Sequence, residues 1–159
     1  MKLFNSAAIA IAAVVFVAPA FAQSPLSDDE ARKIAADIAA KCDAAYNKHD
    51  AAGVAALYAK NGALVPARRA RLFGLFVTGR HAIEKFFTGE FNEFGNQEIT
   101  INDAGPLSEG SMWYIAGVHL SGQGKNGPTS IDGVQVATLV RDGSDWEYRM
   151  TTVTLRPKD

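Results

Sequence analysis

Apolar residues recur at helical spacing over residues 31–46, which is the clearest pattern in the chain. The positions on this stripe are Ala31, Ile34, Ala35, Ile38, Cys42, Ala45 and Tyr46. Ser27 precedes them and Glu30 follows Ser27 by three positions, as in a capping box that satisfies exposed backbone N–H groups. We therefore expect a helix from about residue 28 to residue 46 with one side against a core.

A second, shorter helical pattern follows a break at residues 47–49. Asp50 is placed to cap a helix over residues 51–59. Its apolar side carries Val54, Leu57 and Tyr58. Asn61 and Gly62 tolerate positive φ, so we expect them to end this helix and to lead into a strand.

The second half of the chain favours strands. Residues 63–67 and 72–78 predict a first hairpin, and residues 79–91 predict a third helix. Four further runs alternate polar with apolar residues or are rich in β-branched and aromatic residues: 97–102, 111–122, 129–141 and 146–156. Helices early in the chain and antiparallel strands later predict one α+β domain, with the helices against one face of a single sheet.

Residues 1–22 have the pattern of a bacterial-type signal peptide. Lys2 gives a positive start, residues 7–17 are an uncharged apolar run, and residues 20–22 match the small-x-small motif before a cleavage point. The run is shorter than the roughly 18 apolar residues that span a bilayer, which argues against a membrane anchor. We expect a single mature domain of residues 23–159 that is periplasmic or secreted.

The charge balance narrows the possible partners. The chain has 16 Lys and Arg against 17 Asp and Glu, and loss of Lys2 with the leader would leave it slightly more acidic. A nearly neutral domain is a poor match for nucleic acid or an anionic membrane surface. Cys42 is the only cysteine, so no internal disulfide can form. We expect a small molecule or another protein as the partner.

Four short segments carry a family resemblance: residues 45–50 (AYNKHD), 57–59 (LYA), 79–83 (GRHAI) and 146–148 (WEY). In this order and spacing the chain resembles the SnoaL-like and ketosteroid-isomerase-like branch of the nuclear transport factor 2-like superfamily. The resemblance implies a cystatin-like cone, in which three N-terminal helices pack in a strongly curved, mostly antiparallel sheet of five or six strands, with a pocket at the open end.

The catalytic positions of the steroid isomerases are replaced in this chain. The resemblance places the oxyanion-stabilising tyrosine of those enzymes at Cys42 and their aspartate base at Pro66, and neither residue can do that chemistry. A third acidic position falls near Asp132. If Asp132 points into the cone, burial would raise its pKa and keep it protonated; alternatively, it lies in water at the start of a strand.

The histidines do not predict a metal site. No two of His49, His81 and His119 have the spacing of metal ligands, and no second cysteine or paired carboxylate accompanies them. His119 is a candidate acid/base or ligand donor, because histidine titrates near neutral pH. Cys42 lies on the apolar stripe of the first helix, so we expect it to pack as a small hydrophobe and not to act as a nucleophile.

The last strand supplies most of the predicted pocket. Trp146, Tyr148, Met150, Thr152 and Thr154 share one side, and the resemblance places that side inside the cone. Their hydroxyls suit the orientation of a ligand better than the transfer of its protons. The full predicted ligand-binding set is Tyr46, Tyr58, Tyr114, Asp132, Tyr148, Met150, Thr152 and Thr154.

Two further features concern the partners. Aromatic residues occur on both sides of the strand over residues 111–122, so both faces of the sheet should be covered, which predicts a homodimer formed sheet to sheet; scattered surface aromatics are the alternative. The basic loop at residues 68–71 could attract a carboxylate ligand, or it could simply be solvated.

Three functions remain open from the sequence. The first is an exported, dimeric domain that binds a small, largely apolar molecule in the cone pocket without proton transfer. The second is an isomerase-, cyclase- or hydratase-like enzyme that uses Asp132 or His119 as acid/base. The third is a homodimeric association module whose pocket is filled by its own side chains. No cofactor is expected in any of them.

Overall fold

The computed structural model describes residues 26–66, 76–124 and 127–156. Along the chain these residues form α1 (Asp28–Tyr46), α2 (Ala51–Ala56), β1 (Tyr58–Val65), β2 (Val77–Thr78), α4 (Arg80–Glu90), β3 (Asn96–Ser108), β4 (Ser111–Gly124), β5 (Gly127–Asp142) and β6 (Asp145–Leu155). The predicted leader and the basic loop at residues 68–71 lie outside the described residues. No helix in the described ranges is long and apolar enough to cross a membrane.

The start of α1 follows the sequence closely. The Glu30 backbone N–H donates to Ser27 Oγ at 3.3 Å, and the Ser27 backbone N–H donates to the Glu30 carboxylate at 2.9 Å. Both halves of the predicted capping box are therefore present. The apolar stripe faces the core, with Ala31, Ala35, Ile38, Cys42 and Tyr46 buried. Local pattern and tertiary packing agree over the whole helix.

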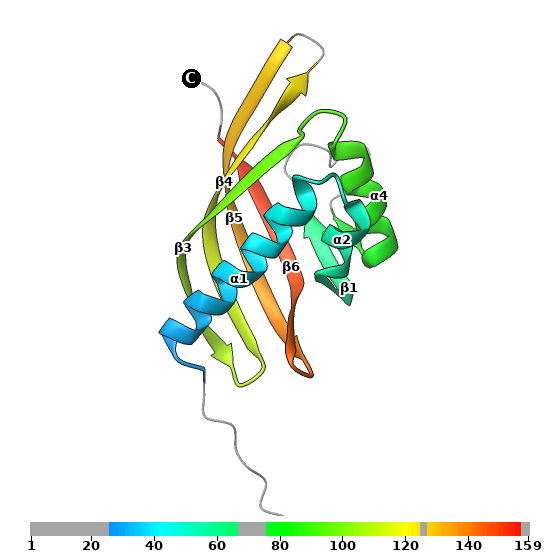
Figure 1. Ribbon diagram of the computed structural model, residues 1–159. Helices are drawn as coiled ribbons and strands as arrows, with labels where there is room; N and C mark the ends of the chain where they lie inside the picture. Colours follow the sequence, from blue (N-terminus) through cyan, green and yellow to red (C-terminus); the bar gives the residue numbers. More distant parts are fainter. Residues whose placement is uncertain (1–25, 67–75, 125–126, 157–159) are drawn as a thin grey trace, which may run out of the picture.

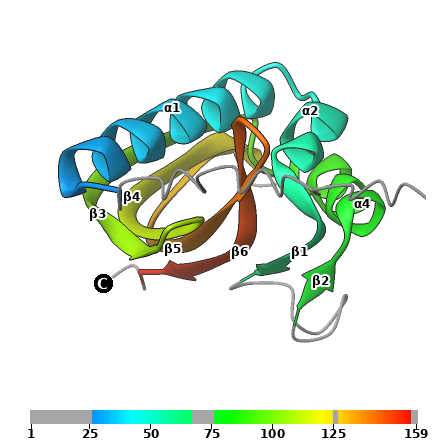
Figure 2. The same cartoon turned by 90° about the horizontal axis from the view of Figure 1, so that it is seen from below.

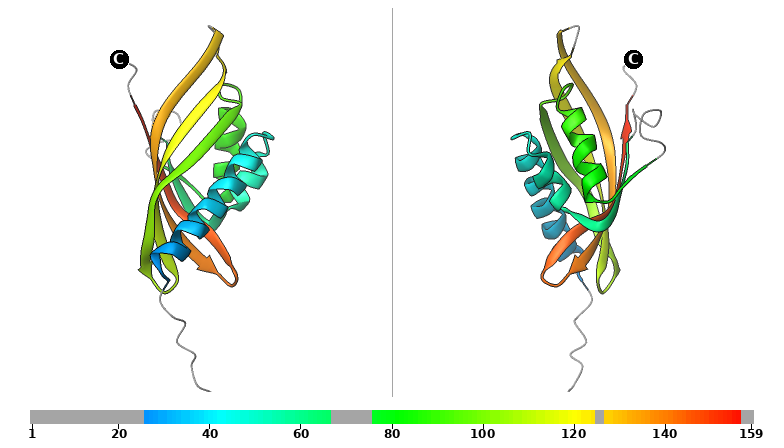
Figure 3. Two further views of the ribbon diagram at one scale, coloured as in Figure 1. Left: turned by 60° about the vertical axis from the view of Figure 1, so that its left-hand side comes forward. Right: turned by 90° about the vertical axis from the view of Figure 1, so that its right-hand side faces the viewer.

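The six strands form one curled sheet in the order β2-β1-β6-β5-β4-β3. All neighbouring pairs are antiparallel except β1 and β6, which are parallel. Figures 1 and 2 show the sheet wrapping around α1, with α2 and α4 beside it. All three helices lie on the same, concave side of the sheet (Figure 3). The predicted α+β cone with a mostly antiparallel sheet is thus confirmed.

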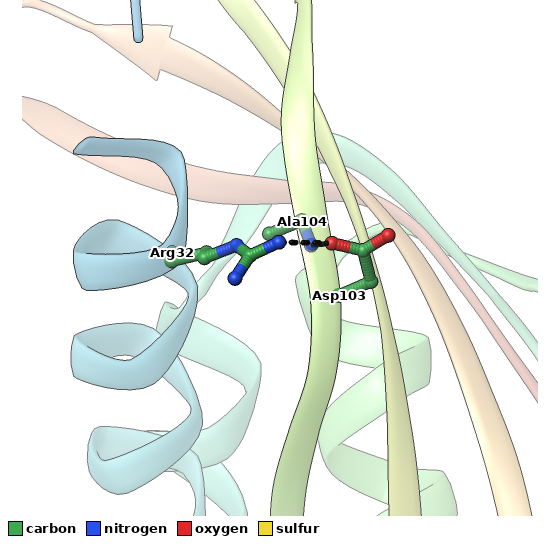
Figure 4. A network of polar contacts seen from close by, with 3 residues as sticks. All are labelled: Arg32, Asp103 and Ala104. Carbon is green, nitrogen blue, oxygen red and sulfur yellow. Dashed lines mark hydrogen bonds and ion pairs between the residues drawn. The ribbon is translucent and has the colours of Figure 1, made fainter. Parts of the chain in front are cut away.

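Polar side chains fasten α1 to the edge strand β3 at both ends of the helix. Near its start, Arg32 Nη2 donates to Asp103 Oδ1 at 3.0 Å, and the Ala104 backbone N–H donates to the same oxygen (Figure 4). After its last turn, the Asn47 side chain accepts from Gln97 N at 2.7 Å and donates to Gln97 O at 3.0 Å. These contacts fix the angle at which α1 crosses the sheet.

The second helix ends earlier than the sequence suggests. Helix α2 stops at Ala56, and Tyr58 begins β1 instead of closing the helix. Asn61 and Gly62, predicted to end the helix, lie inside β1 where its register with β6 is irregular. A Cβ on Gly62 would stand 2.8 Å from the Tyr148 carbonyl oxygen, so the strands can approach here only because this residue is glycine.

Strand β6 contains one extra residue. Leu139 pairs with Tyr148 but Thr138 pairs with Met150, so Arg149 is an insertion in the ladder, a β-bulge. Arg149 Nη1 donates to Asn61 Oδ1 at 2.7 Å and also contacts the Asn61 carbonyl. The hydrogen bonds between Arg149 and Asn61 therefore stabilise the irregular parts of β6 and β1 together. A one-residue insertion exchanges the two faces of the strand beyond it.

Candidate ligand-binding cavity

A cavity lies between the helices and the inner face of the sheet. Its apolar wall consists of Leu64, Pro66, Phe86, Phe87, Val118, Leu120, Val153 and Leu155. Its polar lining consists of Cys42, Tyr46, Tyr58, Glu90, Gln97 and Gln135. The space free of protein atoms is about 670 Å³, a figure that includes open solvent. An apolar wall with a few polar groups is the usual lining of a small-molecule site.

Strand alternation and helix spacing produce the apolar wall. Val118 and Leu120 are alternate residues of β4 and are buried, so both point inward. Phe86 and Phe87 come from the inward side of α4, and their rings meet edge to face with centroids 5.4 Å apart. Because these residues are apolar, most of the cavity wall carries no charge.

A buried network of hydroxyl groups adjoins the cavity through Tyr58 and Gln135, which line it. The Tyr114 hydroxyl donates to Gln135 Oε1 at 3.0 Å, and its oxygen lies 3.0 Å from the Tyr148 hydroxyl oxygen. The Tyr58 hydroxyl is 2.8 Å from Thr151 Oγ1. Burial raises the pKa of all three tyrosines, because charge is disfavoured away from water. The members of this network that line the cavity, Tyr58 and Gln135, are therefore neutral.

Cys42 reaches the cavity but is not activated. Its residue surface is 4% exposed, and burial raises the pKa of the thiol to about 12. Gln97 Nε2 lies 3.5 Å from the sulfur as a weak donor. A thiol with this pKa is protonated at neutral pH, so its role in the described geometry is packing.

Asp43 fixes the orientation of Gln97. One carboxylate oxygen of Asp43 accepts from Gln97 Nε2 at 3.0 Å, and the other accepts from the Ile99 backbone N–H at 2.9 Å. Asp43 is half-buried, and burial raises its pKa. Because an ionised carboxylate only accepts hydrogen bonds, the NH₂ group of Gln97 must face it. Gln97, which lines the cavity, keeps its Oε1 as an acceptor.

The structure brings together four of the eight predicted ligand-binding residues. Tyr46 and Tyr58 line the cavity, and Tyr114 and Tyr148 are fully buried in the hydroxyl network. Gln135 connects this network to the cavity surface. Both replaced isomerase positions, Cys42 and Pro66, also lie on the cavity lining.

The prediction for the end of the last strand was wrong. Met150 is 44% exposed and Thr154 is exposed, and neither of them nor Thr152 lines the cavity. The bulge at Arg149 is the reason, since it turns the following residues over. The residues that face inward are instead Thr151, Val153 and Leu155.

His119 and Asp132 do not reach the cavity. They pair across β4 and β5 on the outer face of the sheet, with His119 Nδ1 2.7 Å from Asp132 Oδ1 and their side chains 47% and 69% exposed. Of the two alternatives for Asp132, the solvent-exposed one is therefore correct, and its inclusion in the predicted ligand-binding set is wrong. His119 lies between the inward residues Val118 and Leu120, and alternation turns it outward. The pair sits in a shallow depression near Arg156.

The predicted ligand-binding set did not include Gln97, Gln135 or Thr151, which belong to the site. A signal for Gln135 was present, because it interrupts an otherwise small and apolar row at alternate positions of β5: Gly133, Ala137 and Leu139. A polar residue at a buried strand position requires a partner. Thr151 could not be found this way, since only the bulge turns it inward. Within the described ranges, no group of three or more His, Cys, Asp or Glu side chains could hold a metal ion.

Comparison with known families agrees with this architecture. A family model described as SnoaL-like domain matches residues 39–148. This match covers the second half of α1 and every element from α2 to the first part of β6. No curated protein matches the chain by sequence.

Solved structures with this fold come from several bacteria. A ketosteroid isomerase-like protein from Erwinia carotovora atroseptica SCRI1043 has 16% identity and a TM-score of 0.70, covering 82% of this chain and 99% of its own. A protein with a cystatin-like fold from Caulobacter vibrioides has 16% identity and a TM-score of 0.66, covering 80% and 91%. An NTF-2 like protein of unknown function from Shewanella oneidensis MR-1 has 16% identity and a TM-score of 0.63, covering 77% and 98%. Such distant likeness establishes the fold alone.

Proposed function

The chain belongs to the SnoaL-like family, and we propose that it binds a small, largely apolar, uncharged molecule in its cavity without transferring a proton. The observation that carries this proposal is the combination of an apolar wall with neutral hydrogen-bonding groups at Cys42, Tyr58 and Gln135. Cys42, Tyr58 and Tyr114 all have raised pKa values caused by burial. Such groups can donate or accept a hydrogen bond at neutral pH, but they cannot act there as a charged base.

Two features favour binding over the other functions that the sequence leaves open. The space in the cavity argues against an association module whose pocket is filled by its own side chains. The position of His119 and Asp132 on the outer face argues against their acting as acid/base on a molecule held in the cone.

Binding can be tested with 2-naphthol as a probe and with two variants at neighbouring positions. Val153 lines the cavity, whereas Thr154 is exposed and outside its lining. We expect 2-naphthol to raise the melting temperature of the wild-type protein, because a ligand that binds only the folded state stabilises it. Val153→Phe should abolish the increase and Thr154→Phe should retain it. An equal increase in both variants would contradict binding in this cavity.

Glu90 supplies a second candidate function, because it is the carboxylate among the described cavity-lining residues. A carboxylate beside an apolar wall can act as a base on an acidic C–H bond. Exchange of the α-protons of 2-tetralone in D₂O, followed by NMR, tests this. Under the binding proposal the exchange stays at the buffer rate. Exchange that the wild-type protein accelerates and Glu90→Gln does not would establish proton transfer instead.

We also propose that the domain is exported and works as a homodimer. Export rests on the leader pattern of residues 1–22, and a mature protein beginning at Gln23 in a periplasmic extract would support it. The dimer is supported by an apolar patch on the outer face of the sheet, formed by Ile115, Val136 and Met150, which are 38%, 45% and 44% exposed. Ile115 and Val136 are direct cross-strand partners, and Met150 lies on the adjacent strand β6.

A further inference from the structure

Gln135 carries a polar atom that the protein itself does not use. The residue is only 6% exposed, and it lies on the cavity lining. Its Oε1 accepts the hydrogen bond from Tyr114. In the described part of the chain its NH₂ group has no partner, although no buried side-chain nitrogen or oxygen is left sealed and unsatisfied. The free end of the carboxamide must therefore be reached from the cavity.

A buried amide NH₂ group without a hydrogen-bond partner destabilises the folded protein. A buried polar group without a partner loses its hydration without compensation. Gln135 could have been an apolar residue like its neighbours in the row, Ala137 and Leu139, which are 1% and 0% exposed. The carboxamide is instead held by Tyr114, whose own hydroxyl lies beside Tyr148. This support holds the amide at a fixed position on the wall.

We propose that Gln135 is the specificity-determining residue of the cavity and that it hydrogen-bonds a hydroxyl or carbonyl oxygen of a neutral, otherwise apolar ligand. This inference rests on the proposed binding function and names the ligand class. A hydroxyl both donates and accepts, so it fits the carboxamide whichever of its two ends faces the cavity. Gln97 Oε1, oriented by Asp43, adds an acceptor for a second donor on the same ligand.

A charged oxygen group is a poor fit to this part of the cavity. A ligand carboxylate near Gln97 would meet an acceptor oxygen backed by the Asp43 carboxylate. The described lining contains no Lys, Arg or His, so at these residues no cation offsets the desolvation of an anion. Cavities with one oriented hydrogen-bonding group in an apolar wall discriminate strongly against ligands that lack the matching polar atom.

The test compares 2-naphthol with naphthalene, which has the same ring system but no hydroxyl. Dissociation constants are measured by fluorescence titration for the wild-type protein and Gln135→Leu. We expect the substitution to weaken 2-naphthol roughly three- to tenfold, the value of one lost hydrogen bond, and to leave naphthalene within about twofold. Retained naphthalene binding also shows that the variant is folded with its cavity intact.

The possible results separate the two proposals. If both probes bind the wild-type protein and Gln135→Leu changes them equally, the role of Gln135 is overturned while binding stands. If neither probe binds the wild-type protein, the binding function itself is overturned. As a measurement that needs no variant, the side-chain amide NMR signals of Gln135 should shift more with 2-naphthol than with naphthalene; equal shifts would count against the proposal.

Discussion

The imidazole Nδ1 of His119 lies 2.7 Å from the Asp132 Oδ1, on the outer face of the sheet. The two residues are direct cross-strand partners in β4 and β5. This geometry resembles an acid/base pair, but the cavity lies behind the strands that carry it, where Val118 and Leu120 point. Substitution of this pair therefore tests whether a ligand binds in the cavity or on the outer face of the sheet.

We expect removal of this pair to leave ligand binding intact. His119→Ala and Asp132→Asn should each bind 2-naphthol within about twofold of the wild-type affinity, because surface pairs contribute little at a distance. Isothermal titration calorimetry gives the comparison. A loss of more than about tenfold in either variant would place a ligand on the outer face instead.

The Cys42 thiol should be nearly unreactive in the folded protein. Its pKa of about 12 leaves almost no thiolate at pH 8, whereas an ordinary thiol is partly ionised there. We expect labelling by iodoacetamide to be at least about a hundredfold slower than in the urea-unfolded chain. Mass spectrometry follows the reaction. Similar rates in the two states would mean that the folded thiol is as accessible and as readily ionised as in the unfolded chain, which would contradict its burial.

The buried Tyr58 and Thr151 hydroxyls should be energetically coupled. They lie 2.8 Å apart, so removing either one leaves the other short of a partner. We expect Tyr58→Phe and Thr151→Val each to lower the free energy of unfolding by about 1–3 kcal/mol. The double variant should lose less than the sum, with a coupling of about 1 kcal/mol. Urea unfolding measures all four proteins, and strictly additive losses would refute the hydrogen bond.

The capping box should make stability depend on acidic pH. Glu30 accepts hydrogen bonds from the Ser27 backbone N–H and then the Ser27 hydroxyl, and these lower its pKa below 4.5. A carboxyl whose pKa is lower in the folded state stabilises that state above its ordinary pKa. This contribution disappears as the pH falls through the lowered value.

We therefore expect the stability advantage of the wild-type protein over Glu30→Gln to shrink as the pH falls below 4.5. Urea unfolding followed by circular dichroism from about pH 6 to about pH 3 measures this difference. Glu109→Gln, which changes an exposed glutamate in the turn between β3 and β4, is the matched control. An advantage that is independent of pH would show that the carboxylate has no part in the cap.

A charge on the outer apolar patch should separate the proposed dimer. Val136 lies within the patch and is 45% exposed, so an aspartate there would have to be desolvated against the second copy. We expect light scattering to give twice the monomer mass for the wild-type protein and the monomer mass for Val136→Asp. Phe76→Asp, which changes another exposed apolar residue beside the edge strand β2, should remain dimeric. A monomeric wild-type protein would contradict the proposal.

The local sequence was sufficient to determine the elements and the family. Capping residues such as Ser27 and Asp50 act through hydrogen bonds to neighbouring N–H groups, so their effect is visible in a few residues of sequence. Alternation in β4 likewise follows from strand geometry alone. These local rules predicted the order of helices and strands and one α+β domain, whereas the cone was implied by the family resemblance.

The tertiary structure decided which side chains form the cavity. Tyr58 lies in β1 and not in the predicted helix. One extra residue at Arg149 reverses which residues of β6 face inward beyond that point. That bulge is held by Asn61, which lies 88 positions earlier in the chain. No local pattern can reveal such a contact, because the irregular strand is stabilised by a hydrogen bond to a residue distant in the sequence. Gln135 acquired its role for the same reason: only the closed cone shows that one end of its amide is held and the other is open to a ligand.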